Sequence, residues 1–238
     1  MQSTGVSQRR QGVLRRIVLL GTPVVLVILE LGHPLLDHTN PIKMLAPIAL
    51  WWIILHMLLI PFFALMGYSL FLLLQGVNSN AATICRWATI IFVAFEVGYD
   101  TAVGLNSGIL VYNATALPVA QQSVVQHALQ QLYTNPAIII CYYILFPAGV
   151  IAICSAAWAL YRAGVARLPV IVLLGTILST YSHALPFGPL GTICFFIAVL
   201  WIELTWRKST AKENNATAIP SVLDRHASLA AEISNEVQ

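Results

Sequence analysis

Residues 82–111 read ATICRWATIIFVAFEVGYDTAVGLNSGILV, a long apolar run that contains two carboxylates, Glu96 and Asp100. A bilayer core about 30 Å thick is crossed by about 20 apolar helical residues. This run therefore predicts a transmembrane helix. It also places two acidic side chains within the membrane, where ionisable groups are costly and usually serve a function.

Five further runs of the same kind flank this one. Over 238 residues, 58% of the side chains are hydrophobic and 9% are charged, and the mean hydropathy is +0.81. Because soluble domains carry about 25% charged residues, this composition excludes a soluble enzyme and a nucleic-acid-binding protein. The predicted fold is all-α, a polytopic membrane protein with a bundle of six transmembrane helices, at residues 16–36, 44–75, 82–111, 137–161, 168–185 and 190–206.

The basic residues indicate how this bundle is oriented. Arg and Lys gather before the first helix, between the second and third, between the fourth and fifth, and after the sixth, whereas Lys43 stands alone on the other side. Positive residues mark the cytoplasmic side. We therefore expect a multi-pass protein of the cell (inner) membrane with both termini cytoplasmic. Its parts are an N-terminal segment (1–15), a transmembrane domain (16–206) and a polar cytoplasmic tail (207–238).

One connection on the outer side carries a helical pattern of its own. In the segment 118–133, Val125, Ala128, Leu129 and Leu132 share one predicted helix face, while glutamines at 122, 126 and 130 share another. The segment is too short and too polar to span a bilayer. It predicts an amphipathic helix lying on the outer membrane surface.

Several ionisable residues fall at matching depth in the outer half of the bundle. His56 lies near the middle of the second helix, and His183 lies at the outer end of the fifth. Glu96 and Asp100 are four residues apart, so both should point from one helix face. We expect these four residues to converge on one cavity, and Glu30 or His33 of the first helix to lie close enough to join it.

A polar stripe on the predicted fifth helix leads to the same place. Thr176, Ser179, Thr180 and His183 follow the spacing i, i+3, i+4 and i+7, so they should face the bundle interior. Asp37 and His38 fall in the first outer loop, where solvated side chains are the default.

The chemistry of this cavity follows from the lack of basic residues near it. Carboxylates without Arg or Lys partners must be protonated, hydrogen-bonded or holding a cation. The sequence therefore predicts an outward-facing site for a proton or a divalent metal ion, with His56, Glu96, Asp100 and His183 as metal ligands, joined by Glu30 or His33. Two alternatives stay open: an accessory membrane subunit whose polar residues only fix helix packing, and a membrane-embedded metal-dependent hydrolase.

Three segments carry a resemblance to a family. The runs LHMLLIPFFALMGYSL (55–70), FVAFEVGYDTAVGLNSGILV (92–111) and SHALPFGPLG (182–191) resemble a family of uncharacterised bacterial multi-pass membrane proteins. The resemblance covers the second to sixth helices and implies a six-helix topology and a bacterial origin, without an activity or a ligand. The sequence implies the lipid bilayer as a partner and no nucleic acid; protein partners and a homo-oligomer stay open.

Overall fold

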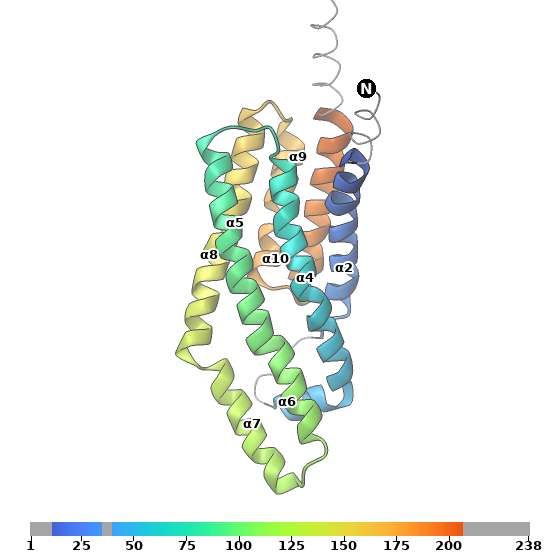
Figure 1. Ribbon diagram of the computed structural model, residues 1–238, viewed down its shortest axis with the longest axis vertical. Coiled ribbons are helices and arrows are strands. Elements are labelled where there is room, and N and C mark those ends of the chain that lie inside the picture. Colours follow the sequence, from blue (N-terminus) through green and yellow to red (C-terminus); the bar gives the residue numbers. More distant parts are fainter. Residues whose placement is uncertain (1–10, 35–39, 207–238) are drawn as a thin grey trace, which may run out of the picture. The chain divides into compact units, whose positions relative to one another are not determined.

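The computed structural model describes residues 11–34 and 40–206, and within these ranges the chain is helical, with no strand (Figure 1). Among the described residues, five helices are long and apolar enough to cross a membrane. Their bounds are Gln11–Leu31, Pro41–Leu73, Asn80–Ala114, Pro136–Arg162 and Phe187–Trp206. The prediction of an all-α chain with several helices that can cross a membrane is therefore confirmed. The predicted tail, 207–238, lies outside the described residues.

The first helix contains η1 (Ile17–Gly21, a π-helical turn) and α2 (Thr22–Leu31). It ends at Gly32, whose amide closes the last turn on the carbonyls of Ile28 and Leu29. The predicted bounds, 16–36, are therefore displaced toward the N-terminus. The consequence is that His33 leaves the helix and lies in the turn that follows it.

Two helical runs are longer than a membrane is thick. The first comprises α3 (Pro41–Leu45), η2 (Ala46–Ile48) and α4 (Ala49–Leu73); the second comprises α5 (Asn80–Tyr99), η3 (Asp100–Leu105, π-helical) and α6 (Asn106–Ala114). The side chains of Asn40 and Ser79 cap their N-termini. At about 1.5 Å per residue, each run reaches about 50 Å, against a bilayer core of about 30 Å.

The next two helices return along the second run. The segment 118–133 is helical as predicted and forms α7 (Val119–Tyr133), which precedes α8 (Pro136–Arg162). Leu129 of α7 is fully buried against residues of α3, α4 and α6, including Ile42 and Val111. The predicted division into faces is only partly right, because Ala128 is exposed and the three glutamines are half-buried. Contact of α7 with a membrane surface stays a prediction.

The predicted fifth span, 168–185, takes a different form. It folds as α9 (Arg167–Leu174) and α10 (Ile177–Tyr181), interrupted at Gly175 and Thr176. The whole segment Arg167–Tyr181 is shorter than the five long helices. Six spans are therefore not confirmed. The broken helix ends just before His183.

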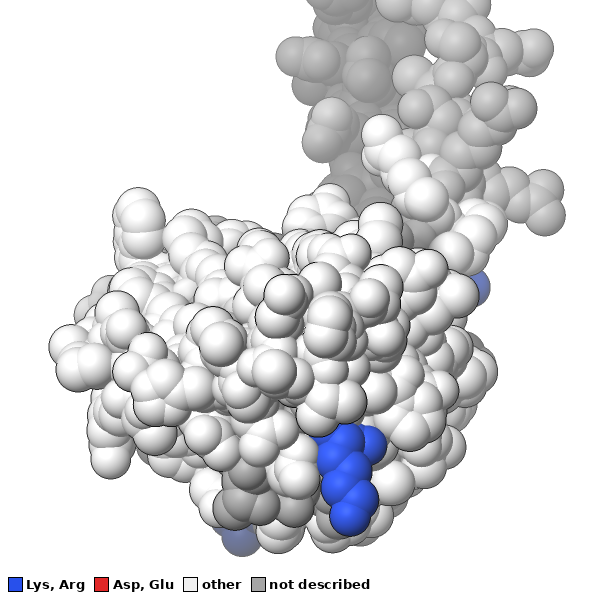
Figure 2. All heavy atoms as spheres, turned by 90° about the horizontal axis from the view of Figure 1, so that it is seen from below, with Lys and Arg blue, Asp and Glu red and all other residues white. Residues whose placement is uncertain are grey.

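The chain divides into two compact units, residues 1–199 and 200–238. In the first unit, α5 packs most extensively on α8, and α4 packs on α2, α5 and α6. In the second unit the structure describes residues 200–206, the last turns of the final helix. Seen from the end where α7 lies, the described side chains are almost all uncharged, with isolated basic groups and no acidic group in view (Figure 2).

Candidate metal centre

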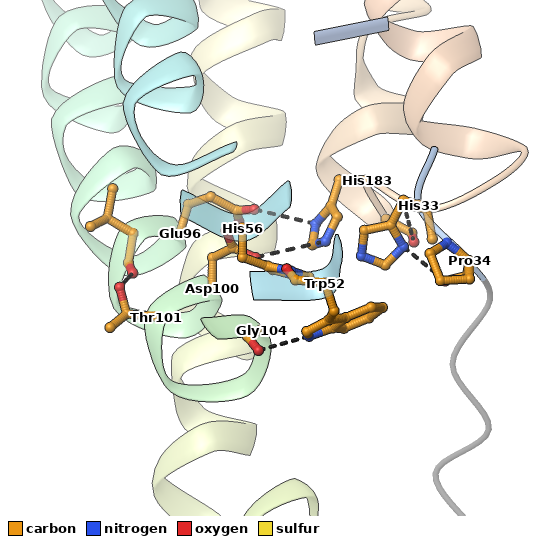
Figure 3. Close-up of polar contacts among 12 residues, drawn as sticks. His33, Pro34, Trp52, His56, Glu96, Asp100, Thr101, Gly104 and His183 are labelled. Carbon is orange, nitrogen blue, oxygen red and sulfur yellow. Dashed lines mark hydrogen bonds and ion pairs between the residues drawn. The ribbon is translucent and has the colours of Figure 1, made fainter. Parts of the chain in front are cut away.

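Side chains from five places in the fold, well separated along the chain, come together around His56 of α4 (Figure 3). They are His33 after α2, His56 in α4, Glu96 in α5, Asp100 at the start of η3 and His183 after α10. The last four come together through the contacts of His56 and His183 with the carboxylates, and His33 joins them. The expectation of one shared cavity is only partly right, because Glu96 does not line the adjoining cavity. The role of these residues as metal ligands stays a prediction, because proximity alone does not demonstrate binding.

The three histidines form the tightest group. One ring nitrogen from each of His33, His56 and His183 lies within 4.8 Å of the other two. In a tetrahedral zinc site with Zn–N bonds of about 2.0–2.1 Å, ligand nitrogens are about 3.3 Å apart. Each nitrogen would need to move by less than about 1 Å toward a common centre.

Backbone carbonyls orient two of these rings. The Nδ1 of His56 lies 2.8 Å from the carbonyl oxygen of Trp52, and that of His33 lies 2.9 Å from the carbonyl oxygen of Pro34. A carbonyl can only accept, so each Nδ1 carries the proton and donates it, and each Nε2 keeps a free lone pair. The Nε2 of His33 is buried without a hydrogen-bond partner. Metal-bound histidines are typically oriented in this way by their second nitrogen.

The two carboxylates have different positions around the histidines. An oxygen of Asp100 lies 3.5 Å from Nε2 of His56 and 3.8 Å from Nε2 of His183. Its other oxygen is buried without a partner. Glu96 instead lies 3.6 Å from Nδ1 of His183. Asp100 is thus beside the nitrogens that would bind an ion, whereas Glu96 is on the opposite edge of His183.

His33 and His183, which lie outside the long helices, have pKa values that are shifted in opposite directions. Burial alone would lower the pKa of His183, but the carboxylates of Glu96, Asp100 and Glu30 outweigh it and raise this pKa from 6.5 to about 9. The pKa of His33 is lowered to about 2 by burial and by the charges of His183 and His56. At neutral pH and without an ion, His183 therefore carries the positive charge of the cluster.

An indole and a glycine hold His56 in place. The indole Nε1 of Trp52 donates a 2.8 Å hydrogen bond to the carbonyl oxygen of Gly104, and the two rings of Trp52 and His56 are 4.4 Å apart. Gly104 belongs to η3 and touches the His56 ring so closely that a Cβ would overlap it. Neither Trp52 nor Gly104 is among the site residues that the sequence predicts. The signal that could have identified Gly104 is a glycine that follows Glu96 and Asp100 in the same transmembrane run.

A cavity of about 250 Å³ adjoins the cluster. It is lined by the histidines and Asp100, and also by Tyr99 and Ser182. The exposed fraction of the side chain is 17% for His183 and 1% for His56 and Asp100. An ion could therefore reach the centre from the cavity, past His183.

Glu30 takes a different place from the one expected. It is fully buried and lines a separate internal pocket, which contains none of the three histidines. Because α2 ends at Leu31, Glu30 points from the helix and His33 from the following turn. Asp37 and His38 lie outside the described residues.

Comparison of the chain with protein-family models, with curated proteins and with solved structures gives no match in any of the three. The resemblance to bacterial multi-pass membrane proteins therefore stays a prediction, and it is the geometry of the centre that bears on function.

Proposed function

We propose that this membrane protein binds a divalent transition-metal ion, Zn²⁺ being the first to test, through Nε2 of His33, His56 and His183. The observation that carries the proposal is the mutual approach of one ring nitrogen from each histidine to within 4.8 Å, with two Nδ1 atoms bound to carbonyls. Imidazole is a preferred ligand of zinc, copper, iron and nickel. Asp100 supplies a fourth ligand, and Glu96 orients His183.

The accessory-subunit alternative is less well supported by the same atoms. Polar residues that serve only packing are expected to be satisfied by their neighbours. Here Nε2 of His33 and one oxygen of Asp100 are buried without partners. An ion would satisfy both of them, which a helix-packing role does not explain.

The proposed orientation has the cavity opening to the outer side of a bacterial inner membrane, with both termini cytoplasmic. Support comes from the basic residues: Arg15 reaches the C-terminal end of α4, Arg86 the loop that follows it, and Arg167 lies over Tyr161 at the end of α8. Such a gathering of basic residues at one end of a bundle is typical of the cytoplasmic side.

A metal-dependent hydrolase is the second candidate. The observation in its favour is the cavity of about 250 Å³ beside the three histidines, since catalytic zinc sites combine three protein ligands with an open position. In this case Asp100 would serve as general base for a metal-bound water and not as a ligand. Asp100→Asn would then retain the metal but lose hydrolytic activity.

A Co²⁺ titration of the metal-free protein in mild detergent tests the proposal. Tetrahedral Co²⁺ absorbs strongly in the visible range, so we expect a saturating spectrum at one Co²⁺ per chain. His33→Ala should abolish this spectrum, while His127→Ala, which alters an exposed histidine of α7, should leave it unchanged. A six-coordinate, weakly absorbing Co²⁺ spectrum in the wild type would contradict the proposal.

A further inference from the structure

A second, mostly apolar pocket lies inside the bundle, between α2, α4, α5, α8, α10 and the start of the final helix. Its volume is about 40 Å³, and it shares no lining residue with the outer cavity. Most of the lining is apolar, including Leu26, Phe63 and Phe195. Its polar lining consists of Glu30, Thr176, Ser179, Thr180 and Thr192.

The carboxylate of Glu30 is the unusual group in this pocket. Its exposed fraction is 0%, and neither oxygen makes a hydrogen bond of good geometry, although the hydroxyl of Thr192 and the charge of His183 both act on it. No Lys, Arg or His is among the residues that line the pocket. A buried carboxylate without a partner is costly, so Glu30 is either protonated or balanced by a positive charge.

Two of the hydroxyls that line this pocket with Glu30 already donate their protons to backbone carbonyls, so they can act only as acceptors toward a further partner. Ser179 donates its proton to the carbonyl of Thr176, and Thr180 donates its proton to the carbonyl of Ile177, both at 2.8 Å. Each oxygen therefore keeps its lone pairs for another partner. The hydroxyl of Thr176, in the break between α9 and α10, is buried without any hydrogen-bond partner.

These groups fit a small hard cation. All the polar side chains offer oxygen ligands, which hard cations prefer, and the pocket lining holds no nitrogen ligand and no thiolate; its one sulfur is the thioether of Met66. A single carboxylate balances a single positive charge. A volume of about 40 Å³ exceeds the roughly 15 Å³ that one water needs, so a dehydrated ion has room. Interrupted helices in membrane proteins commonly contribute to Na⁺ sites.

We propose that Glu30, with the hydroxyls of Thr176, Ser179, Thr180 and Thr192, forms a binding site for a monovalent hard cation, Na⁺ being the ion that the pocket suits. The site shares no lining residue with the cavity of the histidine centre, although the charges of Glu30 and His183 act on each other. Three residues of the polar stripe, Thr176, Ser179 and Thr180, line this pocket. The fourth, His183, belongs to the histidine centre.

Thermal unfolding of the purified full chain, in EDTA to keep the histidine centre empty, tests this site. NaCl is exchanged for choline chloride at constant ionic strength. We expect the unfolding midpoint of the wild type to rise with Na⁺ and to saturate, because an ion that binds only the folded state stabilises it. Glu30→Gln should remove the rise, and Thr176→Val should shift it to about tenfold higher Na⁺ concentration.

Zn²⁺ binding by the same variants separates the two sites, since Glu30→Gln should still bind Zn²⁺ at the histidines. Ser123→Ala, an exposed hydroxyl of α7, should respond to Na⁺ as the wild type does. Equal midpoints in NaCl and choline chloride would overturn the proposal, as would a Na⁺ response that survives in Glu30→Gln. A wild type that responds to pH but not to Na⁺ would also overturn it, and would assign a proton to Glu30.

Discussion

Gly104 packs directly against the imidazole of His56, so closely that a side chain at position 104 would overlap Cδ2 of the ring. The carbonyl of the same glycine accepts the hydrogen bond of Trp52, whose own carbonyl lies against Nδ1 of His56. The π-helical segment η3 thus fixes the ring from one side and Trp52 fixes it from the other. Residues that bind no ion therefore determine where the lone pair of His56 points.

The contact at Gly104 predicts that Gly104→Ala lowers metal affinity without removing a ligand. The added methyl group must displace the His56 ring or η3, and altered ligand orientation typically costs 10- to 100-fold in affinity. Gly98→Ala is the matched control, because a Cβ there meets nothing within 4 Å. Isothermal titration with Zn²⁺ compares the two variants, and equal affinities would mean that the ring is free to move.

The positions of the two carboxylates predict different losses on amide substitution. Glu96→Gln should weaken Zn²⁺ binding by about 10- to 100-fold with unchanged stoichiometry, because Glu96 contacts His183 on the edge away from the ion. Asp100→Asn should cost more if Asp100 is a ligand. Competition against a chelator of known affinity measures both losses. A larger loss for Glu96→Gln than for Asp100→Asn would reverse these assignments.

The charge on His183 predicts that metal affinity increases with pH. The pKa of His183 is raised to about 9, so at pH 7 a bound ion must displace one proton from this ring. The apparent association constant should rise about tenfold per pH unit from pH 7 and level off near pH 9. His33, with its pKa lowered to about 2, adds no competition in this range. A flat profile from pH 7 to 9 would show that His183 is not a ligand.

The proposed orientation predicts which side of the membrane each connection faces. In a variant whose four native cysteines are replaced, a cysteine at Ser123 of α7 should react with an impermeant maleimide added outside intact cells. A cysteine at Arg162, at the end of α8, should react only after the membrane is permeabilised. Both positions are exposed in the structure, so burial does not decide the outcome. Labelling of Arg162→Cys in intact cells would contradict the proposed orientation and indicate the opposite one.

The sequence was sufficient for the class of fold and for the convergence of four site residues. Glu96 and Asp100 both contact His183, as their spacing of four residues predicts. Depth in alternating helices was enough to bring His56 to the same level. These features follow from helix periodicity and membrane thickness, which the sequence contains directly.

The parts that could not be predicted depend on where helices end or change type. The end of α2 at Leu31 separates Glu30 from His33, and the break at Thr176 divides one polar stripe between two sites. Both events require tertiary contacts, such as that of Gly32 with Trp51, which a single-helix pattern does not include. The close approach of Gly104 to His56 is likewise invisible to periodicity.

The most direct measurement is the metal content of the full-length protein, loaded with Zn²⁺ in mild detergent and then dialysed against metal-free buffer. We predict one Zn²⁺ per chain in the wild type and in His127→Ala, and a content near zero in His56→Ala. Zinc that is absent from the wild type, or that persists unchanged in His56→Ala, would contradict a metal centre built on His33, His56 and His183.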